Sequence, residues 1–369
     1  MINRRSLLRQ FSAAALASAL PLRTHAQEPP IFIPATETLR SIASKTGRQI
    51  GCATSLTFLE RELDTAALIA SEYNLMVPEN EMKFAVLQPR EGVFDFKKPD
   101  ALVAFAKANG MGVRGHTLLW YKDERAPWLP ETFPTAKAAE AAMYSHITNV
   151  VKHYRGTIGS WDVVNEGVLP RHEQAMQLRR SIWQEALGPH YIALAFQFAH
   201  AADPKPELVY NENELEYDMR ETDAKRAALL NLIDWLQLQK TPLHAIGIQS
   251  HLRVGMKFNE AKTAAFVKEL TSRNLKVLVT ELDVNDVRIK GGYSERDRGT
   301  ASHAQRYLET LFGAAPINTL AVWGPSDRRS WLNRDWFRPD GSLLRPLPFD
   351  RYLREKPLKA VIANILRQV

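Results

Sequence analysis

The sequence predicts an α/β fold, a single (β/α)8 TIM barrel with its active site at the C-terminal ends of the strands. Short apolar segments typical of strands alternate with amphipathic segments typical of helices from about Ile42 onwards. The strand segment occurs eight times, and eight parallel strands close such a barrel. Polar residues also follow nearly every strand at the same end, which is where barrels carry their active sites.

The first half of the chain contains four predicted strands and three predicted helices. Short runs of β-branched and apolar residues favour strands, and a 3.6-residue apolar period favours helices. Asp100 is expected to cap the second of these helices, and Asn109 and Gly110 to end it. The expected strands are 48–54, 74–79, 112–120 and 160–166, and the expected helices are 64–72, 100–108 and 135–154.

The second half continues this order without a Ser- or Gly-rich linker, so we expect one domain. The alternative architecture is an open doubly wound sheet, which needs a phosphate-binding glycine loop after its first strand. Residues 51–54 (GCAT) are not such a loop. The expected strands are 207–212, 245–251, 276–283 and 319–324, and the expected helices are 191–202, 222–238, 259–273, 294–312 and 358–367.

The composition of the 369-residue chain is that of a globular protein, with 45% hydrophobic and 24% charged residues. A chain of this length is consistent with one α/β barrel. Its single cysteine, Cys52, excludes an internal disulfide and a Cys-rich zinc site. The apolar neighbours of Cys52 favour a buried thiol over a reactive one.

The N-terminal segment has the features of a secretory signal. Its head carries arginines, its middle is apolar and Ala-rich, and a small-residue cleavage site ends it at Ala26. Residues 3–8 (NRRSLL) resemble a twin-arginine export signal. We therefore expect residues 1–26 to be a signal peptide and residues 27–369 to be the catalytic barrel, exported to the periplasm or the exterior.

Loss of the signal peptide changes the charge of the protein. The 48 basic residues fall to 44 because residues 1–26 contain four arginines and no acidic residue, and against 41 acidic residues the net charge falls from +7 to +3. This charge is too small for a nucleic-acid-binding surface. No other apolar run is long enough to cross a bilayer. We therefore expect no nucleic-acid or membrane partner for the mature protein, and a monomer.

Polar residues cluster at the predicted strand ends. In a barrel these ends form one rim, so the side chains are expected to lie around one site. The residues are Glu79 and Asn80 after the second strand, His116 and Trp120 in the third, Asn165 and Glu166 in the fourth, Asn211 and Glu212 in the fifth, Gln249 and His251 in the sixth, Glu281 and Asp283 in the seventh, and Trp323 in the eighth.

Two of these residues, Glu166 and Glu281, predict a pair of carboxylates in one cleft. Such a pair suits glycoside hydrolysis, in which one acid protonates the leaving oxygen while the other is ionised. Mutual repulsion is expected to separate their pKa values and so divide these roles. A single acid at a strand end commonly forms only a salt bridge, but two acids with amide and imidazole neighbours favour catalysis.

Aromatic residues at the same rim favour a carbohydrate substrate. Trp120, Trp323 and Trp331 lie at or just beyond strand ends, and flat aromatic rings stack on the C–H faces of sugars. A catalytic metal is not expected, because no His-x-His or His-Glu-x-x-His spacing is present. Lys83 is four residues after Glu79, so contact with substrate or with an acid is favoured over a Schiff-base role.

Six segments in this order resemble glycoside hydrolase family 10, the endo-1,4-beta-xylanases. Together they span roughly residues 45 to 335, and six segments in order are far more specific than any one alone. They are 78–84 (PENEMKF), 114–120 (RGHTLLW), 161–166 (WDVVNE), 247–252 (GIQSHL), 280–283 (TELD) and 323–327 (WGPSD).

The resemblance implies a retaining double-displacement mechanism without a cofactor, on xylan or xylo-oligosaccharides. Glu281 would be the nucleophile, and Glu166 would be the acid and then the base. His251 would orient Glu281, and Asn165 would contact the sugar 2-hydroxyl. The implied substrate-binding residues are Glu79, Asn80 and Lys83 for the next xylose towards the non-reducing end, His116, Trp120 and Gln249 for the central subsite, and Trp323 and Trp331 for its floor and wall.

Three departures from the family pattern affect substrate binding. The segment after Trp120 reads 121–128 (YKDERAPW), where the family usually has His, Gln and Pro. The fifth-strand tip reads 211–214 (NENE) instead of Asn-Asp-Tyr-Asn, and 345–348 (RPLP) interrupts the usual close. The alternatives left open are another β-1,4-glycanase, such as a cellulase, and a non-catalytic carbohydrate-binding protein.

Overall fold

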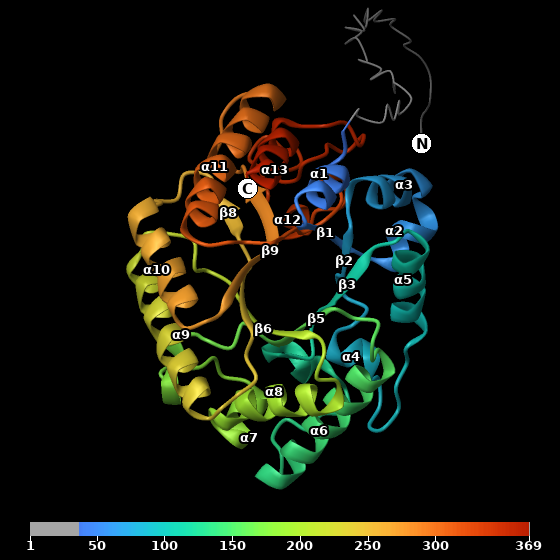
Figure 1. The fold of residues 1–369 in the computed structure, drawn as a ribbon, viewed down its shortest axis with the longest axis vertical. Helices are drawn as coiled ribbons and strands as arrows, with labels where there is room; N and C mark the ends of the chain where they lie inside the picture. The colour runs from blue at the N-terminus through green and yellow to red at the C-terminus, as the bar shows by residue number, and fades with distance from the viewer. Residues whose placement is uncertain (1–36, 369) are drawn as a thin grey trace, which may run out of the picture. The chain divides into compact units, whose positions relative to one another are not determined.

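Parallel strands form a closed ring in the computed structural model, which describes residues 37–368. The ring closes because β1 hydrogen-bonds to both β2 and β10, and β10 also pairs with β9. This is the predicted (β/α)8 barrel (Figure 1). Its strands are β1 (Gln49–Thr54), β2 (Leu75–Pro78), β3 (Gly112–Gly115), β5 (Ser160–Asn165), β6 (Glu207–Glu212), β7 (Ala245–Ile248), β9 (Lys276–Asn285) and β10 (Thr319–Val322), supplemented by β4 (Leu119–Trp120) and β8 (His251–Arg253).

Two predicted strands are interrupted, and both interruptions face the cleft described below. The expected strand 112–120 divides into β3 and β4, and the chain returns to β5 where Leu118 N donates to the Asp162 carbonyl (2.9 Å). The expected strand 245–251 divides into β7 and β8 because Ser250 has a left-handed backbone (φ 66°). The residues at the two breaks, 116–118 (HTL) and 249–250 (QS), include no Gly or Pro, so the sequence did not reveal them.

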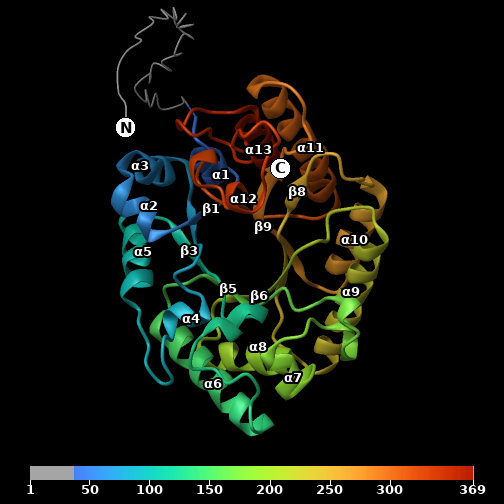
Figure 2. The ribbon, with the colours of Figure 1, turned by 180° about the vertical axis from the view of Figure 1, so that it is seen from behind.

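Helices surround the ring in both views (Figures 1 and 2). The longer helices agree with the prediction to within about three residues. Only the Asp100 cap is wrong: the helix begins three residues earlier, and Asp100 lies in its first turn. These helices are α3 (Leu63–Glu72), α5 (Lys97–Ala108), α6 (Ala136–His153), α8 (His190–Ala202), α9 (Arg220–Leu238), α10 (Glu260–Ser272), α11 (Tyr293–Ala314) and α13 (Pro357–Arg367).

Short helices were not predicted, because one or two turns are too short to show a helical period. Thr38 caps the first of them by accepting a hydrogen bond from Ser41 N (3.1 Å). The short α-helices are α1 (Leu39–Lys45), α2 (Leu56–Arg61), α4 (Phe84–Leu87), α7 (Ile182–Leu187) and α12 (Leu332–Asp335), and the 3₁₀ turns are η1 (Tyr121–Arg125), η2 (Pro170–His172), η3 (Ala175–Gln177) and η4 (Asp327–Arg329).

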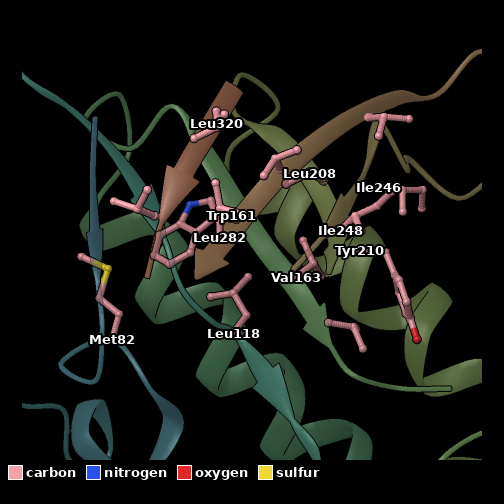
Figure 3. Close-up of a cluster of buried hydrophobic side chains, with 14 of the residues drawn as sticks. Met82, Leu118, Trp161, Val163, Leu208, Tyr210, Ile246, Ile248, Leu282 and Leu320 are labelled. Carbon is pink, nitrogen blue, oxygen red and sulfur yellow. The ribbon is translucent and has the colours of Figure 1, made fainter. Parts of the chain in front are cut away.

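The main core contains the apolar side chains of the strands and of the helices packed on them. Trp161, Leu208, Ile246 and Leu320 are each at most 1% exposed (Figure 3). A separate small cluster contains Trp323 with residues of β1, β2 and β10, and Trp331 packs against it. Because these two indoles also line the cleft, the packing of the barrel fixes their position. Among residues 37–368, no helix has the length and apolarity needed to span a membrane.

Candidate active site

A cleft of about 760 Å³ lies at the C-terminal ends of the strands. Twelve of the site residues expected from the sequence line it, so segments far apart in the chain converge on one cavity, whereas the expected Asn211, Glu212 and Asp283 are buried behind its surface. The twelve are Glu79, Asn80, Lys83, His116, Trp120, Asn165, Glu166, Gln249, His251, Glu281, Trp323 and Trp331.

Glu166 follows β5 directly and is held at both its backbone and its carboxylate. Its φ of 57° lies in the left-handed region that non-glycine residues rarely adopt. Its N–H donates to Asn211 O (2.8 Å), and its carbonyl accepts from Arg179 Nε (2.7 Å). The carboxylate Oε2 accepts from Trp120 Nε1 (3.1 Å), and Oε1 accepts from Gln249 Nε2 (3.0 Å).

Glu281 lies within β9 and is bound by an amide and an imidazole. Its Oε1 accepts from Asn211 Nδ2 (2.6 Å), and its Oε2 lies 3.2 Å from His251 Nε2. The other ring nitrogen of His251 lies 3.0 Å from Asp283 Oδ1. Asp283 Oδ2 in turn accepts from Trp331 Nε1 (2.7 Å). A continuous chain of contacts therefore runs from a cleft indole to the Glu281 carboxylate.

A bridge of amides joins the two glutamates through Asn165. Asn165 Oδ1 accepts from Asn211 Nδ2 (2.9 Å), which also binds Glu281. It also accepts from Gln249 Nε2 (3.2 Å), which also binds Glu166. Because these two donors occupy its oxygen, Asn165 has its Nδ2 amino group left to donate into the cleft.

Hydrogen bonds favour the ionised form of Glu166. Burial alone would raise the pKa of Glu166, but the donors on Gln249 and Trp120 outweigh burial, with help from the positive charges of Arg179 and Lys225. The net pKa of Glu166 is therefore below its usual value.

His251 is held protonated by its two carboxylate neighbours. Burial lowers the pKa of His251, but Asp283 and Glu281 raise it well above the usual value. Both ring nitrogens then carry protons and donate, one to each acid. The imidazolium donates from Nε2 to Glu281 Oε2 and orients that side chain.

The remaining expected residues line other parts of the cleft. Lys83 Nζ donates to Asn80 Oδ1 (3.0 Å), and burial lowers the pKa of Lys83 although nearby acids oppose this shift. Burial raises the pKa of Glu79, and the charge of Lys83 opposes that shift. His116 Nδ1 lies 2.9 Å from Asp162 Oδ2, and the His116 ring meets Trp323 edge-on at 5.1 Å.

The family model for glycosyl hydrolase family 10 matches residues 38–365. The chain belongs to glycosyl hydrolase family 10. The matched range contains the whole barrel and both cleft glutamates, so fold, site and family agree.

Relatives of this family 10 chain cover most of its length. Endo-1,4-beta-xylanase B of Paenibacillus barcinonensis is 35% identical over 84% of this chain and 92% of the relative. Exoglucanase XynX of Acetivibrio thermocellus is 33% identical over 85% of this chain, which is 28% of that longer protein. The native xylanase 10B of Thermotoga maritima has a similar structure, with a TM-score of 0.80 and 28% identity over 89% of this chain and 98% of that chain.

The sequence reasoning assigned no role to three residues that organise the family 10 site. Asn211 binds both Glu281 and Asn165, and Asp283 binds both His251 and Trp331. Both had been placed at strand ends, but their contacts depend on the register of neighbouring strands. Glu216 accepts from the backbone N–H of Ser250 (2.9 Å) and lies beyond the β6 strand end, where the sequence offered no signal.

The site offers no cluster of metal ligands. Within residues 37–368, no three His, Cys, Asp or Glu side chains are grouped so that they could hold a metal ion. The acids of the cleft are instead engaged by amides, indoles and the His251 imidazole. These donors hold the carboxylates of the cleft in place, and the cleft suits a ligand that carries many hydroxyl groups.

Proposed function

We propose that this family 10 enzyme hydrolyses internal β-1,4-xylosidic bonds of xylan with retention, using Glu281 as nucleophile and Glu166 as acid and base. The observation that carries the proposal is that both carboxylates face one cleft and are joined through the amide of Asn165. Retaining glycosidases need two carboxyl groups roughly 5 Å apart, on opposite sides of the bond that is cleaved.

In the first step, a Glu281 oxygen attacks the anomeric carbon and the glycosidic C–O bond breaks. Glu166 transfers its proton to the departing oxygen, so the leaving sugar departs as an alcohol. The donors on His251 and Asn211 hold the Glu281 side chain in position for the attack. The Nδ2 amino group of Asn165 is available to the sugar 2-hydroxyl, and this contact strengthens in the transition state.

In the second step, water attacks the glycosyl-enzyme ester while Glu166 accepts a proton from it. The Glu281 carboxylate leaves, and two inversions give net retention. The lowered pKa of Glu166 suits this role as a base. To act as an acid, Glu166 must first carry a proton. A bound sugar favours this neutral form because the sugar excludes water from the Glu166 carboxyl group, which is only 9% exposed.

The rest of the cleft is proposed to bind the xylose units. Trp323 and Trp331 form apolar faces for a sugar ring, and Lys83 and Asn80 offer polar contacts for its neighbour. Support comes from a structural neighbour, xylanase 10B of Thermotoga petrophila, which was solved in complex with xylobiose. That neighbour has a TM-score of 0.79 and 27% identity over 90% of this chain and 98% of its own.

Product analysis on xylan and carboxymethylcellulose tests the substrate proposal. Xylose lacks the hydroxymethyl group of glucose, so a cleft closed around that position by Lys83, Gln249 and Trp331 selects xylan. We expect short xylo-oligosaccharides from xylan and little product from carboxymethylcellulose. Activity on carboxymethylcellulose alone would establish the cellulase-like alternative. One relative is named an exoglucanase, which is a reason to test this alternative.

We also propose that the protein is exported and is a monomer. The signal-like residues 1–26 lie outside the described part of the chain, so their support is the sequence pattern alone. N-terminal sequencing of protein from the periplasm or medium should begin at Gln27, and replacing Arg4 and Arg5 by lysines should retain the precursor in the cytoplasm. Light scattering should give the mass of one chain. A full-length N-terminus on exported protein would contradict the assignment.

A further inference from the structure

The unusual segment after Trp120 places a lysine in the wall of the cleft. Lys122 belongs to the 3₁₀ turn η1, and its ammonium lies 4.3 Å from the centre of the Trp120 ring and 5.3 Å from that of Tyr121. The side chain is half-buried and lines the cleft. Within residues 37–368, this ammonium has no hydrogen bond and no carboxylate ion pair, and its three donors are available to a ligand.

Two further cations gather at the same pair of aromatic rings. Lys83 Nζ lies 4.9 Å from the Trp120 ring, and the Arg179 guanidinium lies 4.4 Å from the Tyr121 ring. The hydrogen bonds of these two cations go to a neutral amide and a backbone carbonyl, not to carboxylates in the described part of the chain. We call Lys83, Trp120, Tyr121, Lys122 and Arg179 the cationic corner. Its like charges repel one another, so a bound anion would stabilise the arrangement.

The catalytic acid does not neutralise this corner by direct pairing. Both carboxylate oxygens of Glu166 accept hydrogen bonds from the uncharged donors Trp120 and Gln249. Glu166 attracts Lys122 through space, and burial still lowers the pKa of Lys122. The corner therefore retains a half-buried ammonium that no carboxylate of residues 37–368 contacts directly, although Glu166 and Asp335 attract it from a distance.

We propose that Lys122, supported by Lys83, binds the carboxylate of an acidic side group carried by the glycan, a uronosyl substituent. This inference rests on the proposed function, because a cleft that binds a glycan chain receives an anion as part of that chain. An ammonium recognises a carboxylate by charge-assisted hydrogen bonds. Lys122 therefore favours substrates that carry acidic side groups. Trp120 still stacks on a sugar ring and donates a hydrogen bond to Glu166.

The test compares two oligosaccharides that differ only in charge. One carries a glucuronosyl side group, and the other is the same compound with its carboxyl group reduced to an alcohol. The readout is the ratio of their kcat/KM values. We expect about a fivefold preference of the wild-type enzyme for the acid, the upper range for a partly exposed ion pair. Lys122→Met should bring the ratio near one, whereas Lys122→Arg should retain it.

Two controls make the result specific. Lys107→Met removes a lysine on the exposed face of α5 and should leave the ratio as in wild type. About 0.5 M sodium chloride should reduce the wild-type preference because it screens the charge. A wild-type ratio of one, or an unchanged ratio in Lys122→Met, would overturn the inference. Failure to cleave unsubstituted xylo-oligosaccharides would instead refute the proposed function, so the two failures are distinguishable.

Discussion

At the scale of single residues, the two glutamates differ in their surroundings more than in their burial. Glu166 is 9% exposed and accepts from uncharged indole and amide donors, whereas Glu281 is 4% exposed and faces the His251 imidazolium. The hydrogen bonds to Glu166 from Trp120 and Gln249, with the more distant charges of Arg179 and Lys225, lower the pKa of Glu166. This contrast in surroundings supports the proposed roles of Glu281 as nucleophile and Glu166 as proton carrier.

Trp120→Phe should shift the pH profile to higher values. The indole N–H stabilises the Glu166 carboxylate, so its removal raises the pKa of Glu166, and the protonated acid persists to higher pH. We expect the basic limb of kcat/KM to move up by about 0.7 pH unit, the equivalent of one hydrogen bond of about 1 kcal/mol. Lost stacking lowers the rate at every pH without moving this limb. If the basic limb of the pH profile stays at the same pH or moves to lower pH, the proposed role of the Trp120 indole is contradicted.

Glu281→Ala should abolish hydrolysis and respond to added azide. Loss of an essential nucleophile costs roughly 10⁴-fold or more in kcat. Azide can enter the space left by the carboxylate and attack an activated xyloside, which gives an α-configured azide product. Product configuration by NMR checks this, with Glu140→Ala on the exposed face of α6 as the control. Turnover of Glu281→Ala similar to the control would refute the nucleophile assignment.

At the scale of elements, the break between β7 and β8 arranges two site residues at once. Ser250 is fully buried with a left-handed backbone, which turns its neighbours Gln249 and His251 towards the two glutamates. Glu216 accepts from Ser250 N (2.9 Å), and Tyr307 Oη lies 3.0 Å from Ser250 Oγ. These contacts offset the cost of the backbone conformation.

Glu216→Ala should lower kcat more than it changes KM. Without its acceptor, Ser250 is free to shift, and misplacement by about 1 Å can cost on the order of 100-fold. Glu216→Gln retains an oxygen acceptor for Ser250 N–H and should restore most of kcat. Steady-state kinetics on xylotetraose and circular dichroism of all three proteins separate this effect from misfolding. If the Gln variant is as impaired as the Ala variant, the hydrogen bond is not the cause.

The sequence predicted those site residues whose position follows directly from the strand that they end. Glu166 and Glu281 stand at the ends of apolar strands, so their convergence follows from the barrel. The left-handed backbones of Glu166 and Ser250 carry no such signal, because neither residue is a glycine. The bridging contacts of Asn211 could not be predicted either, because they depend on the register that places β6 beside β5 and brings β9 within reach.

At the scale of the whole molecule, the segment after β10 is fastened to the barrel by buried ion pairs. Arg345 lies 2.6 Å and Lys356 Nζ 3.6 Å from Asp297 of α11, and within the segment itself Lys356 Nζ lies 2.9 Å from Asp327 Oδ2. The unusual residues 345–348 also pair with a strand, since Val284 N donates to the Pro346 carbonyl (3.1 Å). The altered close of the chain thus holds β9 next to Asp283, the acid that accepts a hydrogen bond from Trp331 Nε1.

Lys356→Met should destabilise the fold by about 3 kcal/mol, because it leaves Asp327 buried without its counter-ion. Burial already raises the pKa of Asp327 to about 6, with Lys356 opposing the shift. A carboxyl with a raised folded pKa favours folding at low pH, and this contribution is lost as pH rises through about 4 to 6. The lysine offsets that loss, so the destabilisation should be larger at pH 8 than at pH 5.

Urea denaturation at the two pH values measures this effect. Lys268→Met, on the exposed face of α10, is the matched control and should behave as wild type. An equal or smaller loss of stability at pH 8 than at pH 5 would show that the ion pair does not act as described.

The division of roles between Glu281 and Glu166 is tested most directly by trapping the glycosyl-enzyme. A 2-deoxy-2-fluoro-β-xylobioside with a good leaving group forms the ester rapidly and releases it slowly, because fluorine destabilises both oxocarbenium-like transition states. Mass spectrometry of the intact protein and its peptides should find one xylobiosyl adduct, located on Glu281. An adduct on Glu166, or no adduct together with an α-configured product from the natural substrate, would contradict the mechanism.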